Sequence, residues 1–163
     1  MTQSFDRRSV LGYCVGGAAG AVLLASASPS FAATTQFKAD LKGSTEVPPN
    51  TTTGTGSVTA TFDPGSKELT WTGTYSGLTG PATAAHFHGP AEAGKNAGVA
   101  VWLSEKGKPF DSPFKGSATL TDAQASDLMA GLWYANIHTA ANPGGELRGQ
   151  VTKSYKRGLL GIL

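Results

Sequence analysis

The chain has 163 residues, of which 39% are hydrophobic and 15% are charged, a composition typical of one globular domain rather than a multidomain assembly. The formal net charge of +2 is too small to concentrate a polyanion, which argues against nucleic acid as a partner. The 22 glycines and 9 prolines indicate a turn-rich chain, and such chains bury a core most readily as β-sheets.

Residues 1–32 have the pattern of an export signal. Arg7 and Arg8 precede a stretch of small and apolar residues, and Ser30, Phe31 and Ala32 match a small-residue cleavage site. The apolar stretch is shorter than the roughly 20 strongly apolar residues that a membrane-spanning helix needs. We therefore expect a twin-arginine signal over 1–32 and a periplasmic or secreted mature chain without a stable membrane span.

The rest of the chain divides into a β-domain over residues 33–152 and a C-terminal tail over residues 153–163. Apolar and polar residues alternate over 37–41, 58–62 and 69–75, which predicts half-buried antiparallel strands. Short strands are also predicted, from the same alternation and the turn residues between them, over 83–88, 98–103, 115–120, 132–138 and 146–152.

One short helix interrupts the strands. Thr121 and Gln124 have the spacing of a capping box, and Gly131 supplies the residue type that ends a helix. About eight antiparallel strands with one short helix predict an all-β fold, a Greek-key sandwich or barrel. We expect Leu128 and Met129 of this helix to lie in the core, together with the tryptophans of the predicted strands, Trp71, Trp102 and Trp133.

The chain has three histidines, and their spacing indicates a metal site. His86 and His88 lie two apart in one predicted strand, so their side chains share a face with Cα atoms about 6.6 Å apart. Two such imidazoles can hold one ion, and His138 from a neighbouring strand would complete a three-histidine site with an open position. The alternative is a structural role, in which the histidines only form hydrogen bonds to neighbouring groups.

Copper is the expected ion and zinc the alternative. Imidazole-rich sites favour Cu(II) in the affinity series of divalent metals. The single cysteine, Cys14, falls within the predicted signal, which excludes a blue-copper site and a cysteine-type zinc site in the mature chain.

Three polar residues accompany the histidines in the later strands. Glu146 and Arg148 lie two apart in a predicted strand and share a face. They either form a solvated ion pair, worth under about 1 kcal/mol, or place Arg148 where its charge attracts a small anion to the open metal position. In the metal interpretation Arg148 is the candidate catalytic residue, and Asn136 and Glu146 are candidates for orienting the ligands.

Several motifs point to one family. They are EVPP at residues 46–49, AHFHGPA at 85–91, GV at 98–99, and WYANIHT at 133–139, which leads into PGGELRGQ at 143–150. In this order, over residues 37–151, they resemble the chordin-type (CHRD) domain, which occurs in chordin and in many microbial secreted proteins. The resemblance implies a secreted β-domain and names no reaction.

A weaker likeness is to the copper/zinc superoxide dismutases, which are Greek-key barrels. There His86 and His88 would match the copper-binding pair, His138 a further ligand, and Arg148 the anion-guiding arginine. The chain lacks a fourth copper histidine, a bridging histidine, a separate zinc cluster and the cysteines of a structural disulfide. The likeness implies, for an enzyme, a copper-dependent oxidoreductase of this type, but these departures put dismutase activity in doubt.

Two functions follow from these observations. The first is an exported domain that binds copper, or alternatively zinc, through His86, His88 and His138. Its role would be copper buffering, delivery to a partner, or modest redox chemistry on a small anion. The second is a metal-free module that binds an extracellular protein or polysaccharide through a β face.

Overall fold

The computed structural model describes residues 33–155, which contain nine strands, one 3-10 turn and one α-helix. The export signal predicted over 1–32 and residues 156–163 of the predicted tail lie outside the described residues. The elements in chain order are β1 (Thr35–Lys42), the 3-10 turn η1 (Gly43–Thr45), β2 (Thr55–Asp63), β3 (Glu68–Ser76), β4 (Ala82–His88), β5 (Val99–Trp102), β6 (Phe114–Thr119), α1 (Asp122–Met129), β7 (Tyr134–Thr139), β8 (Leu147–Gln150) and β9 (Thr152–Lys153). Among the described residues, none of the helical segments has the length and hydropathy of a membrane span.

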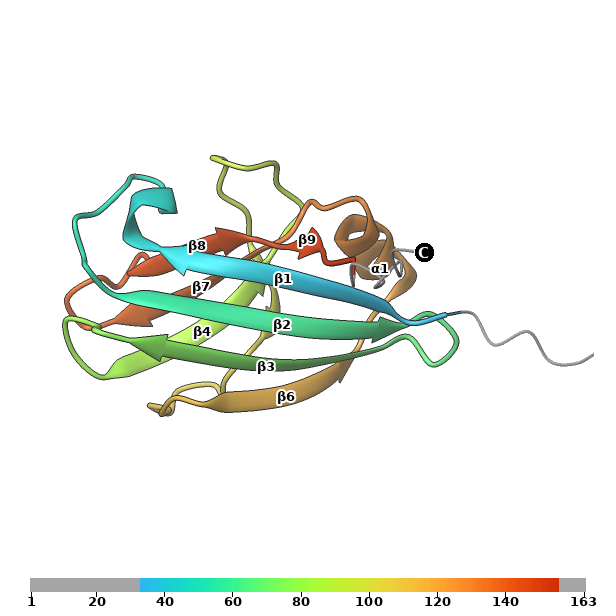
Figure 1. The fold of residues 1–163 in the computed structure, drawn as a ribbon, viewed down its shortest axis with the longest axis horizontal. Helices are drawn as coiled ribbons and strands as arrows, with labels where there is room; N and C mark the ends of the chain where they lie inside the picture. The colour runs from blue at the N-terminus through green and yellow to red at the C-terminus, as the bar shows by residue number, and fades with distance from the viewer. Residues whose placement is uncertain (1–32, 156–163) are drawn as a thin grey trace, which may run out of the picture. The chain divides into compact units, whose positions relative to one another are not determined.

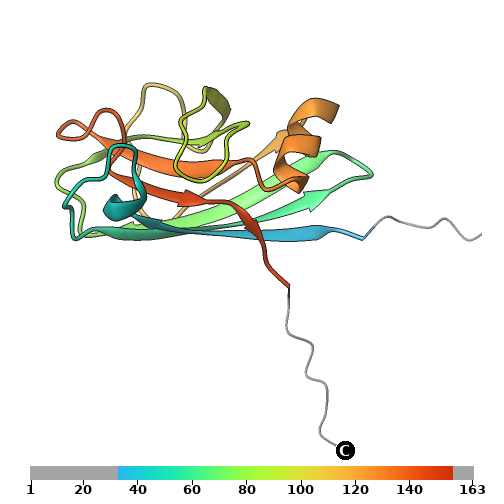
Figure 2. The same ribbon diagram turned by 90° about the horizontal axis from the view of Figure 1, so that it is seen from above.

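The strands form one antiparallel sheet that curls into a nearly closed barrel. Its order is β5-β4-β7-β8-β1-β2-β3-β6, and β9 pairs with β1. Figures 1 and 2 show β1, β2, β3 and β6 in one layer and β4, β7 and β8 in the other. Because β6 pairs with β3 and β7 pairs with β4, the connections cross between the layers as in a Greek key. The predicted all-β Greek-key fold with one short helix is confirmed.

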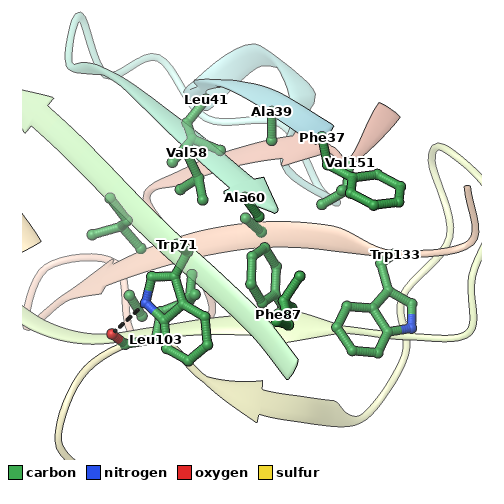
Figure 3. Packing of buried hydrophobic residues seen from close by; sticks show 14 of the residues in the cluster. Phe37, Ala39, Leu41, Val58, Ala60, Trp71, Phe87, Leu103, Trp133 and Val151 are labelled. Atoms are coloured by element: carbon green, nitrogen blue, oxygen red, sulfur yellow. Dashed lines mark hydrogen bonds between the residues drawn. The ribbon is translucent and has the colours of Figure 1, made fainter. Parts of the chain in front are cut away.

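Side chains that alternate along the strands fill the space between the two layers. Phe37, Ala39 and Leu41 of β1 are buried, and the polar residues between them are exposed. Figure 3 shows them in one cluster with Phe87 and Trp133, which come from the opposite side of the domain. Each large apolar side chain buried in this way contributes about 1.5–3 kcal/mol, so the alternation seen in the sequence is what holds the layers together.

Trp71 joins the two halves of the core. Its Nε1 atom donates a hydrogen bond of 3.2 Å to the carbonyl oxygen of Leu103, and its ring meets Phe87 edge to face (Figure 3). The indole lies directly over Gly116 of the neighbouring strand, where a Cβ atom would come within 2.6 Å of the ring. Glycine is therefore required at position 116 to let the tryptophan lie flat.

The capping box and part of the core prediction are confirmed. The Thr121 side chain accepts from the backbone N–H of Gln124, and Leu128 is fully buried. Met129 was predicted in the core, and this is wrong because it is 37% exposed. Adjacent helical residues point about 100° apart, so a short helix that buries Leu128 turns Met129 outwards.

Trp102 also departs from its predicted place in the core. It lies half-buried on the edge strand β5, opposite His86 of β4. Because side chains alternate along a strand, Trp102 faces away from the core that Val101 contacts.

A polar layer lies on the outer face of β4, β7 and β8. The pairing of these strands sets His86 opposite Asn136, and Asn136 opposite Arg148. All three side chains are buried, although they point away from the hydrophobic core. The loops 43–54 and 89–98 cover this layer and form hydrogen bonds with it. The fold therefore holds a second, polar interior beside its apolar one.

Candidate metal centre

Two neighbouring strands bring the three histidines together. His86 and His88 point to the same face of β4, and β7 runs beside β4 with Asn136 opposite His86. His138, two residues after Asn136, projects from that same face. One ligand nitrogen from each histidine lies within 4.8 Å of the other two. The predicted convergence of the three histidines is therefore present in the fold.

Asn136 stands at the centre of the cluster. Its Oδ1 atom lies 3.0 Å from His88 Nε2 and 2.9 Å from His138 Nε2. The third imidazole joins through His86 Nδ1, which is 3.0 Å from His138 Nε2. Four polar side chains thus face a common point.

Backbone carbonyls fix the orientation of two of the rings. His88 Nδ1 lies 3.0 Å from the Ala97 carbonyl oxygen, and His138 Nδ1 lies 2.9 Å from that of Pro143. A carbonyl can only accept, so each Nδ1 carries the proton and each Nε2 of the neutral ring keeps its lone pair. Both lone pairs are directed to the centre, which is the arrangement that backbone carbonyls impose on histidines that bind metals.

Burial keeps the imidazoles neutral. Burial, with smaller contributions from the neighbouring His138 and His88, lowers the pKa of His86 to about 4, and a hydrogen bond to Asn136 opposes the shift. Burial also lowers the pKa values of His88 and His138. The Nε2 atom of His86 is buried and has no hydrogen-bond partner. At neutral pH the cluster therefore offers uncharged nitrogens, the form that metal ions require.

Aromatic rings enclose the cluster on two sides. The Trp102 ring meets His86 edge to face, with 4.2 Å between their centroids. The Tyr134 ring lies parallel to His88, at 4.8 Å between centroids and 2° between planes. These contacts exclude solvent from His86 and His88 and limit the rotation of their rings.

Arg148 lies beside this cluster but does not touch the histidines through a hydrogen bond. Its guanidinium carbon lies 3.4 Å from the Tyr134 ring centroid, and Tyr134 comes from the strand between those of Arg148 and His88. Its nitrogens donate to Asn96 Oδ1 at 2.7 Å and to the Lys95 carbonyl. The positive charge nevertheless opposes protonation of His88 and contributes to the lowering of its pKa.

Glu146 occupies a separate place in the polar layer. It is fully buried, and its carboxylate accepts hydrogen bonds from the hydroxyls of Thr52, Thr79 and Thr139. Burial acts to raise its pKa, but these bonds outweigh burial and lower the pKa to about 2. The interpretation of Glu146 and Arg148 as a solvated ion pair is wrong, because both are buried and no ion pair joins them within the described residues.

Glu146 stabilises the loop that orients His138. Thr139 and Asn142 both donate to its Oε2 atom, and Asn142 directly precedes Pro143 in the loop. The Pro143 carbonyl is the acceptor for His138 Nδ1. Glu146 thus acts on the cluster through the loop and at a distance from it.

Comparison with known proteins identifies the domain. A family model of the CHRD domain matches residues 37–151, nearly all of the described chain. The chain belongs to the CHRD domain family. CHRD domains are typically extracellular modules, and in this one the AHFHGPA motif spans the end of β4 while WYANIHT covers β7. Searches of curated proteins and of solved structures gave no match.

Three residues of this CHRD domain that bear on the site escaped prediction as functional residues. Tyr134 shares a face with Asn136 and His138 because it lies two and four residues before them, and this spacing was readable in the sequence. Trp102 was assigned to the core. Glu46, in the EVPP motif, is 5% exposed, and burial raises its pKa to about 7 against the opposing charge of Arg148. Its approach to the polar layer depends on the path of the 43–54 loop, which no local pattern encodes.

Proposed function

We propose that this CHRD domain binds one transition-metal ion outside the cytoplasm, through His86, His88 and His138. The observation that carries the proposal is the inward direction of the lone pairs of His88 and His138, fixed by the carbonyls of Ala97 and Pro143. Three neutral imidazoles that face one centre are a ligand set typical of zinc and copper sites.

The residues around the centre fit a cation. His88 Nε2 and His138 Nε2 present lone pairs to Asn136 Oδ1, which is also an acceptor. Acceptors that face one another need either a cation or proton donors between them. In the metal-free protein the Asn136 amide, turned over, supplies two N–H donors to the two imidazoles. With a metal bound, its oxygen faces the ion and becomes a fourth donor.

Copper is the ion we propose, with zinc as the alternative, because imidazole-rich sites favour Cu(II) in the affinity series of divalent metals. His86 Nδ1, His138 Nε2, Asn136 Oδ1 and His88 Nε2 follow one another at 3.0, 2.9 and 3.0 Å. These distances are close to those between ligands that lie about 2.0–2.1 Å from one ion.

The role that fits such a centre is copper buffering or delivery, with redox chemistry on a small anion as an extension of it. Arg148 is separated from His88 by Tyr134, so we assign it to holding the Tyr134 ring in place rather than to direct contact with a metal-bound anion. Glu146 fixes the loop that orients His138. A stable binding site does not require turnover, and the burial of His86 and His88 under aromatic rings suits storage.

Metal analysis of the exported protein, purified without an affinity tag, tests the proposal. We expect about one equivalent of copper per chain, and in titrations a loss of affinity of at least about 100-fold in His88→Ala. Thr72→Ala, on the exposed face of β3, is the control and retains wild-type affinity. No metal in the wild type, with weak binding unchanged in His88→Ala, would overturn the proposal and leave the metal-free interaction module.

A further inference from the structure

A cavity of about 380 Å³ is lined by Arg148, the residue whose guanidinium lies on the Tyr134 ring. Three segments that are far apart in the sequence line it: η1 with the residues after it, the loop between β4 and β5, and β8. Its polar walls include Glu46, Arg148 and Gln150, and Ala93 lies at its exposed rim. This volume is well above the roughly 30 Å³ that one water occupies, and it lies in the range of small-molecule sites.

Arg148 brings a buried positive charge to this cavity. The side chain is 2% exposed, and both hydrogen bonds that it donates end on neutral acceptors, Asn96 Oδ1 and the Lys95 carbonyl. No carboxylate among residues 33–155 lies within the 4.0 Å of an ion pair. Buried guanidinium groups are almost always paired, and this one keeps N–H donors beyond the two that are used.

Glu46 contributes a second unmatched polar group. Its side chain is 5% exposed, and its Oε1 atom is buried without a hydrogen-bond partner. It does not form an ion pair with Arg148 within the described residues. Burial raises its pKa to about 7, so at neutral pH a large share of the molecules carry the uncharged acid. Arg148 is therefore the only permanently charged residue of the lining, and Glu46 adds a hydrogen-bonding group to the same cavity.

The other polar walls suit hydroxyl groups rather than a second charge. Gln150 uses its amide nitrogen on the carbonyls of Ala91 and Gly131, which leaves its amide oxygen as its remaining polar atom. Ser44 adds an exposed hydroxyl to the wall. A bare inorganic anion would pair with the guanidinium and leave most of this space and these groups unused.

We infer that the cavity binds a small organic carboxylate that carries hydroxyl groups, such as a sugar acid, with its carboxylate on Arg148 and its hydroxyls toward Glu46, Ser44 and Gln150. Guanidinium and carboxylate groups match in a fork of two parallel hydrogen bonds, which gives both affinity and orientation. The same chemistry occurs in a free sugar acid and in the uronate units of a polysaccharide. None of the residues that line this site is a histidine, so the candidate metal ligands stay in place in the variants that test it.

Calorimetric titration of the exported protein, stripped of metal with a chelating resin, tests the inference. Glucuronate is the first probe, a short oligogalacturonate is the second, and neutral methyl glucoside is the control ligand. We expect saturable binding of glucuronate at least about tenfold tighter than binding of the glucoside. Tighter binding of the oligosaccharide than of glucuronate identifies a polysaccharide source, and equal or weaker binding identifies the free acid.

Two variants separate the cavity from a general charge effect. Ala93→Trp fills the cavity from its exposed rim without removing any polar contact, and Arg148→Gln removes the cation. Each is expected to weaken glucuronate binding by about tenfold or more, while Thr72→Ala leaves it unchanged. Binding that persists in a folded Ala93→Trp protein, or equal binding of glucoside and glucuronate, would overturn the inference. Because the protein is metal-free, this result is independent of the metal proposal.

Discussion

His88 and Tyr134 lie face to face, with their ring planes 2° apart and their centroids separated by 4.8 Å. The guanidinium of Arg148 covers the same tyrosine ring at 3.4 Å from its centroid. One aromatic ring thus couples the candidate metal ligand to the lining of the cavity. Tyr134 also donates from its hydroxyl to the Ala97 carbonyl, the group that accepts from His88 Nδ1. The orientation of His88 therefore depends on Tyr134 in two ways.

Tyr134→Phe and Tyr134→Leu distinguish the stacked ring from the hydroxyl. Phenylalanine keeps the ring between His88 and Arg148, so we expect copper affinity within about threefold of wild type. Leucine removes the flat surface and frees the imidazole to rotate, and affinity should fall by about tenfold or more. Competition with a chromogenic chelator measures both variants. Equal affinities for the two variants would show that stacking does not orient His88.

Substitutions of Asn136 should either weaken or strengthen metal binding, depending on the group that replaces its amide. In Asn136→Ala the oxygen that faces His88 and His138 is lost, and copper affinity should fall by about tenfold. Asn136→Asp places a charged oxygen donor at the same position and should tighten binding. Metal titration followed by visible absorption tests the pair, and wild-type affinity in both variants would place Asn136 outside the metal centre.

Much of this geometry could be predicted from the sequence, because strand alternation fixes which residues share a face. His86 and His88 share one face of β4, and Phe37 and Leu41 share the core face of β1, because side chains alternate with a period of two residues. Sequence alone could not place Glu146 or Arg148, because their partners come from loops that are distant in the chain. Such contacts depend on the tertiary path of a loop, and they decide whether a charged residue is solvated or buried.

The predicted export signal is tested at its paired arginines. Replacement of both Arg7 and Arg8 by lysine keeps the charge and removes the twin-arginine pair, so the precursor should accumulate in the cytoplasm. In the wild type, mass spectrometry of the exported protein should find a chain that begins at Ala33. An exported protein that retains residues 1–32, or export that persists in the double variant, would contradict this assignment.

Glu146 should make the fold sensitive to acid. Its pKa falls from 4.5 to about 2 on folding, so between these values the unfolded chain binds more protons than the folded domain. The stability that the carboxylate contributes, about 3 kcal/mol, is complete above pH 4.5 and is lost as the pH falls towards 2. Urea unfolding should find Glu146→Gln less stable than wild type at pH 7, with a smaller difference at pH 3. The control Glu68→Gln, at an exposed position, should unfold like wild type, and a Glu146→Gln deficit independent of pH would exclude this origin.

Glu46 should make the folded domain less stable as the pH rises, the reverse of the effect of Glu146. Burial raises its pKa from 4.5 to about 7, and among residues 33–155 the charge that acts on it is that of Arg148, whose effect opposes the shift. The folded domain then binds more protons than the unfolded chain between pH 4.5 and 7, so this contribution is complete below pH 4.5 and is lost as the pH rises through 7. The wild type should lose up to about 3 kcal/mol over this range relative to Glu46→Gln, which cannot ionise. We expect Glu46→Gln to be the more stable protein at pH 8, with the advantage shrinking towards pH 4.

Parallel stability curves for the two proteins between pH 4 and 8 would mean that Glu46 keeps an ordinary pKa. The cavity would then contain a carboxylate rather than an uncharged acid at neutral pH.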